Sequence, residues 1–469
     1  MRYKIITIIF SFLCATYGTA INNTDSKFNI QASAPFAKGS TVYLARYWKS
    51  NPYSIDSTTV SPEGKFSFSK AEPLEPGQYL LLIKPDQKIE LLIDKQQSDI
   101  KIDLNENLIN STISGNDDTK LYWNYIKEYT PYASQIQKSY NILENEKSSD
   151  LERAEAKKQY AQLLDKIDQL LNKHIKAQKG TWFASFIKAA YEINPPHLFP
   201  EEQQQQIENG QYLRKHFFDN IDFEDKRLWN TEFFSRQMDY FLYNIVSQHP
   251  DSIAQATSEL VAKSQNNNEA FEQMLSNLFN SAATSPMMGM ENVWARLAED
   301  YIFDKDISWI DSTLHSSLLA EYALIEQNRL GMIAQDLLLR TIDGDSIHTS
   351  EIEADFTLLY FYSTTCSHCD HEMEELRKNF FPKYTDRGLK VITVNTGTDI
   401  EAWKKFMTKH EMEGEGWYNL FDPSFSSQYW LKFDVSATPS LYFLDKDKRI
   451  LAKKIDLTNL ELYLSRILK

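Results

Sequence analysis

Two cysteines three positions apart, Cys366 and Cys369, are the residues best suited to chemistry in this chain. The 469 residues contain one other cysteine, Cys14, which lies in a stretch typical of a removable export signal. A mature chain with a single Cys-x-x-Cys pair has no second pair from which to build a disulfide framework, so a working dithiol is favoured over a structural bridge. The pair therefore predicts thiol–disulfide exchange, with Cys366–Cys369 as a redox-active disulfide.

Two other kinds of site also use closely spaced cysteines. Cys366, His368, Cys369 and His371 offer four nitrogen and sulfur ligands, but structural zinc sites usually take two ligand pairs from separate segments. Covalent haem attachment requires a histidine directly after the second cysteine, and Asp370 occupies that position. We therefore expect neither a metal nor an organic cofactor at this pair.

The segments that flank the cysteines predict how they are positioned. An uninterrupted apolar run, residues 356–362, is typical of a buried parallel strand, and a helix is expected from Ser367 onward. A cysteine at a helix N-terminus lies among free backbone amides and the positive end of the helix dipole, which both favour its thiolate. Cys366 is therefore expected to be the nucleophile, and Cys369 to resolve the mixed disulfide. A cationic His368 would stabilise the thiolate further and make the pair more oxidising.

Strands alternate with helices over residues 331–469. We expect strands over residues 337–342, 356–362, 389–395 and 417–421, and helices over residues 367–378, 401–410, 424–431 and 457–468. A hairpin is expected between residues 441–444 and 450–453, because charged turn residues separate two apolar runs. This alternation predicts an α/β domain.

The chain before residue 331 divides into two parts of different character. Over residues 27–115, short apolar segments separated by proline and glycine turns predict a small all-β sandwich or barrel. Over residues 117–330, apolar residues recur at helical spacing and predict an all-α middle domain whose many aromatic residues pack in its core. The β-rich part has no cysteine and no cluster of metal ligands, so we expect it to fold or dock rather than catalyse.

Residues 1–20 have the pattern of a secretory signal peptide. Basic residues precede a short uncharged apolar run, and small residues occupy the cleavage positions at Gly18-Thr19-Ala20. The run is too short for a permanent membrane helix, and no other candidate span is visible. Export to the periplasm or outer envelope is therefore predicted, without a membrane-spanning helix. Leu13 stands where a lipobox has a small residue, which argues against a lipid anchor on Cys14.

The charge of the chain limits its partners. Its formal net charge is −15 at pH 7, and an acidic surface repels phosphate backbones, so no nucleic-acid partner is expected. An exported protein meets an oxidising compartment, where a working dithiol needs an upstream redox partner to reset it. The expected partners are this reset protein and protein clients that carry thiols or disulfides.

Residues 331–469 resemble a thioredoxin-fold domain of the TlpA/ResA type, the exported thiol–disulfide oxidoreductases. The resemblance rests on three features in order along the chain: the strand Leu358–Tyr362, the cysteine pair, and Ala437-Thr438-Pro439-Ser440 before an apolar strand. It implies that Pro439 is the cis-proline that faces the disulfide. It also implies that the backbone of Thr438 pairs with a bound client.

The same resemblance assigns a role to Glu372, six residues after Cys366. Members of this family hold a carboxylate near the dithiol, where it can relay a proton to or from Cys369. Three departures from the family pattern stand out. The usual Trp before the first cysteine is Thr365, and the usual Gly-Pro or Glu-Pro dipeptide is Ser367-His368. The helix-kinking Pro is replaced by Glu374, and Tyr360 stands where thioredoxin has a buried Asp. These departures leave the direction of electron flow open.

The layout of the upstream residues is similar to envelope proteins of Gram-negative bacteria, in which β-rich and helical domains of unknown function precede such a domain. We therefore predict an exported oxidoreductase that exchanges disulfides with envelope proteins, a reductase by family default, with a part in cell redox homeostasis. The alternative is an envelope protein-binding module whose dithiol is a redox sensor or a vestige.

Overall fold

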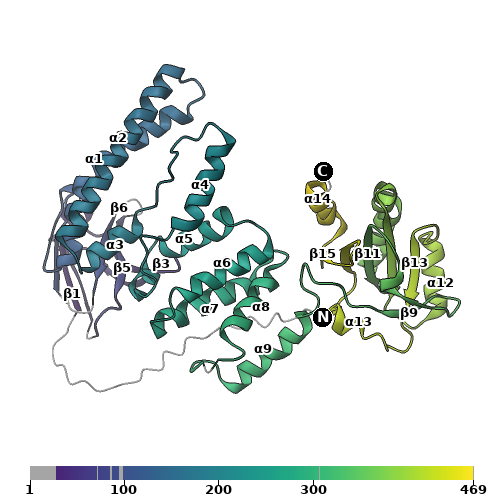
Figure 1. Cartoon of the computed structure of the whole chain (residues 1–469). Helices are drawn as coiled ribbons and strands as arrows, with labels where there is room; N and C mark the ends of the chain where they lie inside the picture. Colours follow the sequence, from purple (N-terminus) through teal and green to yellow (C-terminus); the bar gives the residue numbers. More distant parts are fainter. Residues whose placement is uncertain (1–27, 71, 85–86, 95–98, 306, 468–469) are drawn as a thin grey trace. The chain divides into compact units, whose positions relative to one another are not determined.

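The computed structural model describes residues 28–70, 72–84, 87–94, 99–305 and 307–467. The predicted signal peptide, residues 1–20, and Cys14 lie outside this range. The chain forms two compact units. One contains the described residues up to Gln248 together with Val261–Gln273, and the other contains His249–Leu260 and Met274–Lys469. The predicted combination of an all-β domain, a helical region and an α/β domain is confirmed (Figure 1).

The N-terminal domain is a β sandwich of two four-stranded sheets, ordered β4-β1-β7-β8 and β3-β2-β5-β6. Its strands are β1 (Phe28–Ser33), β2 (Thr41–Trp48), β3 (Asn51–Thr59), β4 (Lys65–Lys70), β5 (Gly77–Lys84), β6 (Gln87–Ile93), β7 (Asp99–Asp103) and β8 (Thr112–Ser114). Alternate side chains of both sheets, such as Ile30, Leu44 and Leu81, are buried in one shared core. This period-two burial is what the alternating sequence of the strands produces.

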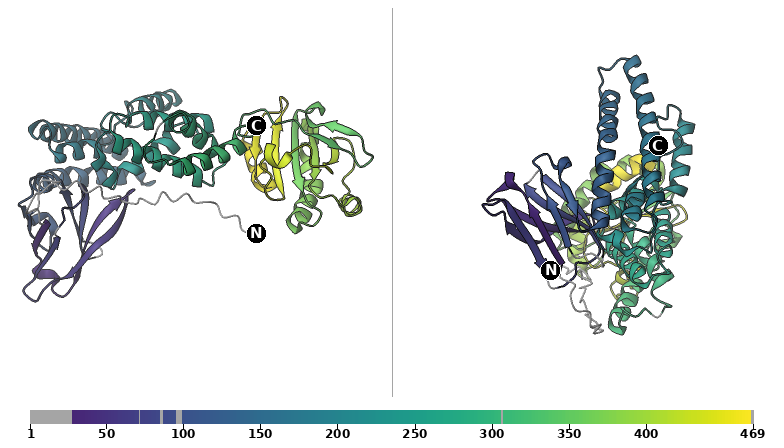
Figure 2. Two further views of the ribbon diagram at one scale, coloured as in Figure 1. Left: turned by 90° about the horizontal axis from the view of Figure 1, so that it is seen from below. Right: turned by 90° about the vertical axis from the view of Figure 1, so that its left-hand side faces the viewer.

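The helical region starts with a long antiparallel pair, α1 (Asp117–Glu144) and α2 (Asp150–Ala177), which lie side by side (Figure 2). Ser149 starts α2 with a capping box, because its hydroxyl accepts from the Glu152 amide and the Glu152 carboxylate accepts from the Ser149 amide. The remaining helices are α3 (Trp182–Ala190), α4 (Gln203–His216), α5 (Phe234–Tyr240), α6 (Pro250–Ala262), α7 (Asn268–Thr284), α8 (Met290–Tyr301) and α9 (Ser312–Ile325). In the described part of the chain, no helix is long and apolar enough to cross a membrane.

A seven-stranded mixed sheet, ordered β10-β9-β13-β12-β11-β14-β15, organises the C-terminal domain. Its strands are β9 (Leu338–Arg340), β10 (Ser346–His348), β11 (Phe356–Tyr362), β12 (Leu389–Asn395), β13 (Trp417–Phe421), β14 (Ser440–Asp445) and β15 (Ile450–Lys453). Strand β11 runs parallel to β12 and antiparallel to β14. The C-terminal end of β11 and the N-terminal end of β14 therefore lie side by side at one end of the central strands. The cysteines follow β11 there, and Pro439 directly precedes β14.

Helices cover the central strands of this sheet, and the principal ones are α10 (Ser367–Glu375), α12 (Ile400–Lys409), α13 (Tyr429–Lys432) and α14 (Leu457–Ile467). Because successive residues of β11 point to opposite faces, Tyr360 joins a core with Trp403 of α12 and Leu460 of α14. Its neighbour Phe361 joins the opposite core with Phe433. Both faces are buried, in agreement with the uninterrupted apolar sequence of β11.

The prediction of a helix over residues 424–431 is wrong for its first half, since α13 begins at Tyr429. The carboxylate of Asp422 holds the preceding residues as a loop. It accepts hydrogen bonds from the amides of Ser426 at 3.1 Å and Ser427 at 2.8 Å. Aspartate side chains that bind nearby amides compete with the helical hydrogen-bond pattern, which the apolar spacing alone could not reveal.

Candidate active site

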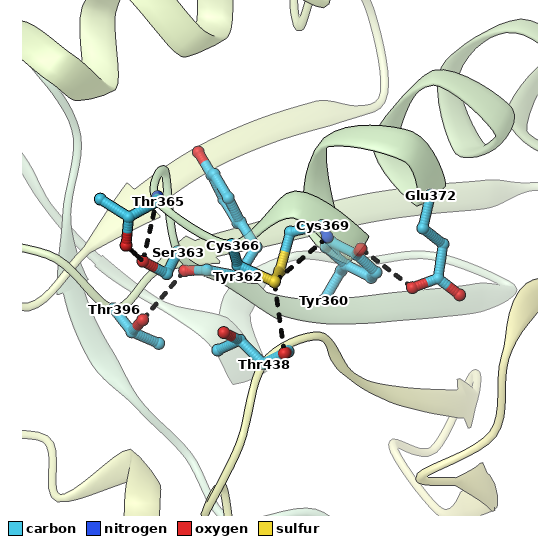
Figure 3. The surroundings of a disulfide bond; sticks show 9 residues. All are labelled: Tyr360, Tyr362, Ser363, Thr365, Cys366, Cys369, Glu372, Thr396 and Thr438. Carbon is cyan, nitrogen blue, oxygen red and sulfur yellow. Dashed lines mark hydrogen bonds between the residues drawn. A yellow bond between two sulfur atoms is a disulfide. The ribbon is translucent and has the colours of Figure 1, made fainter. Parts of the chain in front are cut away.

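The two cysteines lie at the start of α10 and are joined by a disulfide, with their Cα atoms 5.2 Å apart (Figure 3). Cys366 is the N-cap residue of α10, and the amide of Cys369 donates a hydrogen bond to its sulfur at 3.2 Å. Cys366 is partly exposed, whereas Cys369 is fully buried. In the reduced protein this arrangement favours a thiolate on Cys366, because the helix amides and dipole stabilise negative charge there.

The loop before β14 faces the outer cysteine. The carbonyl oxygen of Thr438 lies 3.3 Å from Sγ of Cys366, and the Thr438–Pro439 peptide bond is cis. The loop thus presents a backbone oxygen beside the reactive sulfur, while Pro439 has no amide hydrogen to donate. A bound polypeptide could extend this edge of the backbone by strand-like pairing.

Glu372 lies on the same helix as the buried cysteine, three residues further along. Its carboxylate accepts hydrogen bonds from the hydroxyl of Tyr360 at 3.1 Å and from the amide of Leu457 at 3.2 Å. Burial raises the pKa of Glu372 above the ordinary range, and the two hydrogen bonds oppose that rise. A half-buried carboxyl with a raised pKa is suited to proton transfer near neutral pH.

Tyr360 is the functional residue that sequence reasoning did not assign. In the sequence it stands out only as the residue at the position where thioredoxin has a buried Asp. The sequence contains one signal for it: residues 360 and 362 of a buried strand are both tyrosines, and both hydroxyls need a hydrogen-bond partner. Tyr360 donates to Glu372, and Tyr362 accepts from Nε1 of Trp403 at 2.7 Å.

The two residues between the cysteines, Ser367 and His368, are exposed. His368 is close enough for its charge to favour the ionised form of Glu372, as a minor influence. Asp370, directly after the second cysteine, has its pKa lowered by hydrogen bonds from Lys409 and from His410, the latter at 2.7 Å. Its charge is therefore compensated and adds little repulsion to a thiolate nearby. Among the described residues there is no cluster of metal ligands.

Family comparisons divide the chain into three matched regions. Residues 330–453 match the AhpC/TSA family. Residues 28–122 match a domain of unknown function, DUF4369, and residues 172–328 match another, DUF5106. The first match covers the dithiol and the cis-proline loop, so the family similarity and the site geometry concern the same part of the chain.

Individual proteins are similar to parts of this chain. The thiol–disulfide oxidoreductase ResA of Bacillus cereus is 22% identical over 145 residues, which are 30% of this chain and 78% of that protein. A thioredoxin-like protein from Bacteroides caccae is 20% identical with a TM-score of 0.43, over 59% of this chain and 98% of that one. A domain of a possible thiol–disulfide isomerase from Cytophaga hutchinsonii is 31% identical with a TM-score of 0.28, over 29% of this chain and 92% of that one. The chain is therefore a thioredoxin-like thiol–disulfide oxidoreductase of the ResA/TlpA type, with further domains N-terminal to its dithiol domain.

Proposed function

We propose that this protein is exported to the periplasm or outer envelope, where it exchanges disulfides with protein clients through Cys366-Ser367-His368-Cys369. The observation that carries this proposal is the contrast between the two sulfurs. One is partly exposed at a helix N-terminus beside a backbone carbonyl, and the other is buried one turn behind it. Attack and resolution need this asymmetry, because the client must reach only the first sulfur.

Reduction of a client is the proposed direction. The Cys366 thiolate attacks one sulfur of the client disulfide, a mixed disulfide forms, and the first client sulfur leaves as a thiolate that takes a proton. The Cys369 thiol loses its proton and attacks Sγ of Cys366, which releases the second client thiol. Two electrons pass to the client, and the Cys366–Cys369 disulfide remains for an upstream redox partner to reduce.

The surrounding residues have proposed roles in this cycle. Glu372 accepts the proton of Cys369 during resolution, because burial raises its pKa above the ordinary value and makes it a stronger base. His368 tunes the Cys366 thiolate from its exposed position, with Ser367 as its neighbour between the cysteines. The backbone at Thr438 and Pro439 aligns the client. The division into residues 27–115, 117–330 and 331–469 stays a prediction.

Single-cysteine variants test the function directly. Cys366→Ser should abolish reduction of a protein disulfide such as those of insulin, because the attacking sulfur is gone. Cys369→Ser should form the mixed disulfide and stop there, so that client proteins are recovered covalently attached from envelope extracts. Full insulin turnover by Cys366→Ser would overturn the proposal. A Cys369→Ser variant that captures nothing would favour the alternative, a binding module with a sensing or vestigial dithiol.

The reduction potential decides the direction. A client-reducing dithiol is expected near the potential of thioredoxin, about −270 mV, whereas oxidases and isomerases lie near −120 to −180 mV. Equilibration of the full chain with glutathione buffers, read by alkylation of free thiols, measures it. A value in the second range would replace reduction by disulfide donation or isomerisation as the activity.

A further inference from the structure

Two hollows lie beside the cis-proline loop and share a wall. The first, about 250 Å³, is lined by Glu372, Pro439 and Ser436 among others. The second, about 920 Å³, reaches to Met287 and Met288, which precede helix α8. Both hollows are lined by the same four residues, namely Asp434, Lys454, Ile455 and Asp456. They therefore form one groove, called here the cis-proline groove, that starts at Glu372 and Pro439 and ends against residues that precede and begin α8.

The far wall of this groove is held in place by buried contacts. Sδ of Met288 accepts a hydrogen bond from the amide of Lys453 in β15 at 3.4 Å. The ammonium of Lys453, only 6% exposed, contacts Asn328 at 2.6 Å and Glu291 at 2.9 Å. The residues of α8 and of the segment after α9 thus pack on the edge strand of the catalytic sheet. Residues that precede and begin α8 consequently form one wall of the larger hollow.

The groove is apolar along its far end. Met287 is 47% exposed and Leu462, on α14, is 56% exposed, and both line the larger hollow. Large apolar side chains exposed together beside a hollow mark a binding surface more often than isolated ones do. Burying one such side chain against a ligand gains enough free energy to change a rate constant severalfold.

The charges of the groove are complementary to a basic ligand. Of its two lysines, Lys453 is buried against Glu291, and Lys454 is paired with Asp434. Glu372 and Asp456 both line the smaller hollow. Burial raises the pKa of Glu372, and repulsion from the negative charge of Asp456 adds to that rise. A cationic side chain that entered between them would relieve this repulsion.

We propose that the cis-proline groove binds an extended client segment that flanks the client's reactive cysteine and carries apolar side chains and a basic residue. This inference rests on the proposed function, because the client cysteine must first lie at Cys366 beside the carbonyl of Thr438. The segment then continues past Pro439 into the groove, and Met287 and Leu462 contact its apolar side chains. The helical region, through Met287, takes part in choosing the client.

Three disulfide probes test the groove with the full-length reduced protein. Two are synthetic peptides with one cysteine held as a mixed disulfide with thionitrobenzoate, flanked either by leucine, methionine and lysine or by glycine and serine. The third is the small disulfide dithiobis-nitrobenzoate. The wild type should react about tenfold faster with the apolar, basic peptide than with the glycine–serine peptide. Replacing the lysine of that peptide by glutamate should remove part of the advantage.

Surface variants locate the effect. Met287→Ser combined with Leu462→Ser should abolish the tenfold advantage and leave the other two probes unchanged. The matched control is Leu338→Ser, since Leu338 is also 47% exposed but lies on β9. The proposed groove would be overturned if the wild type reacted at equal rates with both peptides, or if the rate advantage survived in the double variant. It would also be overturned if the double variant lost rate equally toward all three probes. Absence of any reaction with the small disulfide would instead count against the proposed function.

Discussion

At the scale of single residues, the two sulfurs differ because the backbone around them differs. Cys366 caps a helix and faces a carbonyl, whereas Cys369 lies in the core next to Tyr360 and Met373. A buried thiol resists ionisation, so resolution needs a base. Glu372 is the half-buried carboxyl on the same helix. Burial raises its pKa, and the hydrogen bonds from the amide of Leu457 and the hydroxyl of Tyr360 oppose that rise.

Removing this base should slow resolution specifically. In Glu372→Gln, the decay of the mixed disulfide should fall by about 100-fold, within the range that general bases contribute, and its rise with pH through the Glu372 pKa should disappear. Stopped-flow measurement of mixed-disulfide decay against pH tests this. Attack by Cys366 should be unchanged, and an unaltered pH profile of resolution would contradict the assignment.

Tyr360 should act through Glu372. Its hydroxyl donates to the carboxylate and favours the ionised form, so Tyr360→Phe should raise the pKa of Glu372 and move the pH inflection of resolution upward. Tyr362→Phe is the matched control, because the Tyr362 hydroxyl bonds Trp403 instead. Equal shifts in both variants would show a general packing effect rather than a specific hydrogen bond.

At the scale of elements, short polar segments decide where helices begin. Ser149 and Glu152 start α2 with a capping box, a pattern that is local in the sequence. Asp422 instead delays α13 by binding two amides of its own loop. Burial disfavours ionised Asp422, but the hydrogen bonds from Ser427 and Ser426 outweigh it and lower its pKa.

Asp422 should therefore stabilise the C-terminal domain in a pH-dependent way. A depressed carboxyl pKa gives stability that is present above the unfolded value, about 4, and is lost as the pH falls through the folded value. Asp422→Asn should cost about 1–3 kcal/mol at pH 7, and the difference from wild type should shrink in acid. Calorimetry of the full chain against pH measures this, with the exposed turn variant Asp343→Asn as control. A difference that stays constant with pH would be evidence against the ionic role of Asp422.

At the scale of the whole molecule, each compact unit combines parts that the sequence presents separately. Residues of α8 and the segment after α9 belong to the same unit as the catalytic sheet. Gly331 and Met332 hydrogen-bond to Ile450 of the edge strand β15. An edge strand with unpaired backbone groups invites aggregation, and these contacts cover it.

The buried ion pair between Lys453 and Glu291 should stabilise the contact between α8 and β15, called here the junction. Glu291→Ala leaves the Lys453 ammonium buried without its carboxylate, which should weaken the junction by about 3 kcal/mol. Hydrogen–deuterium exchange in α8 and β15 should then accelerate by about 100-fold. Adding Lys453→Met should restore protection, because an apolar side chain needs no partner there. Glu326→Ala, at the exposed end of α9, is the control. Exchange protection of α8 and β15 equal to wild type in Glu291→Ala would contradict the role of this ion pair.

The family resemblance implied the cis-proline loop, whereas the sequence by itself determined the dithiol, the strand and helix that flank it, and the order of β-rich, helical and α/β regions. These features are set by local spacing, periodicity and turn chemistry, which a linear chain displays. Only the tertiary structure decided that Tyr360 bonds Glu372, that Asp422 keeps residues 424–427 out of a helix, and that Met287 lines a groove with Leu462. Such contacts join residues from different elements, and their partners are fixed by packing in three dimensions rather than by distance along the chain.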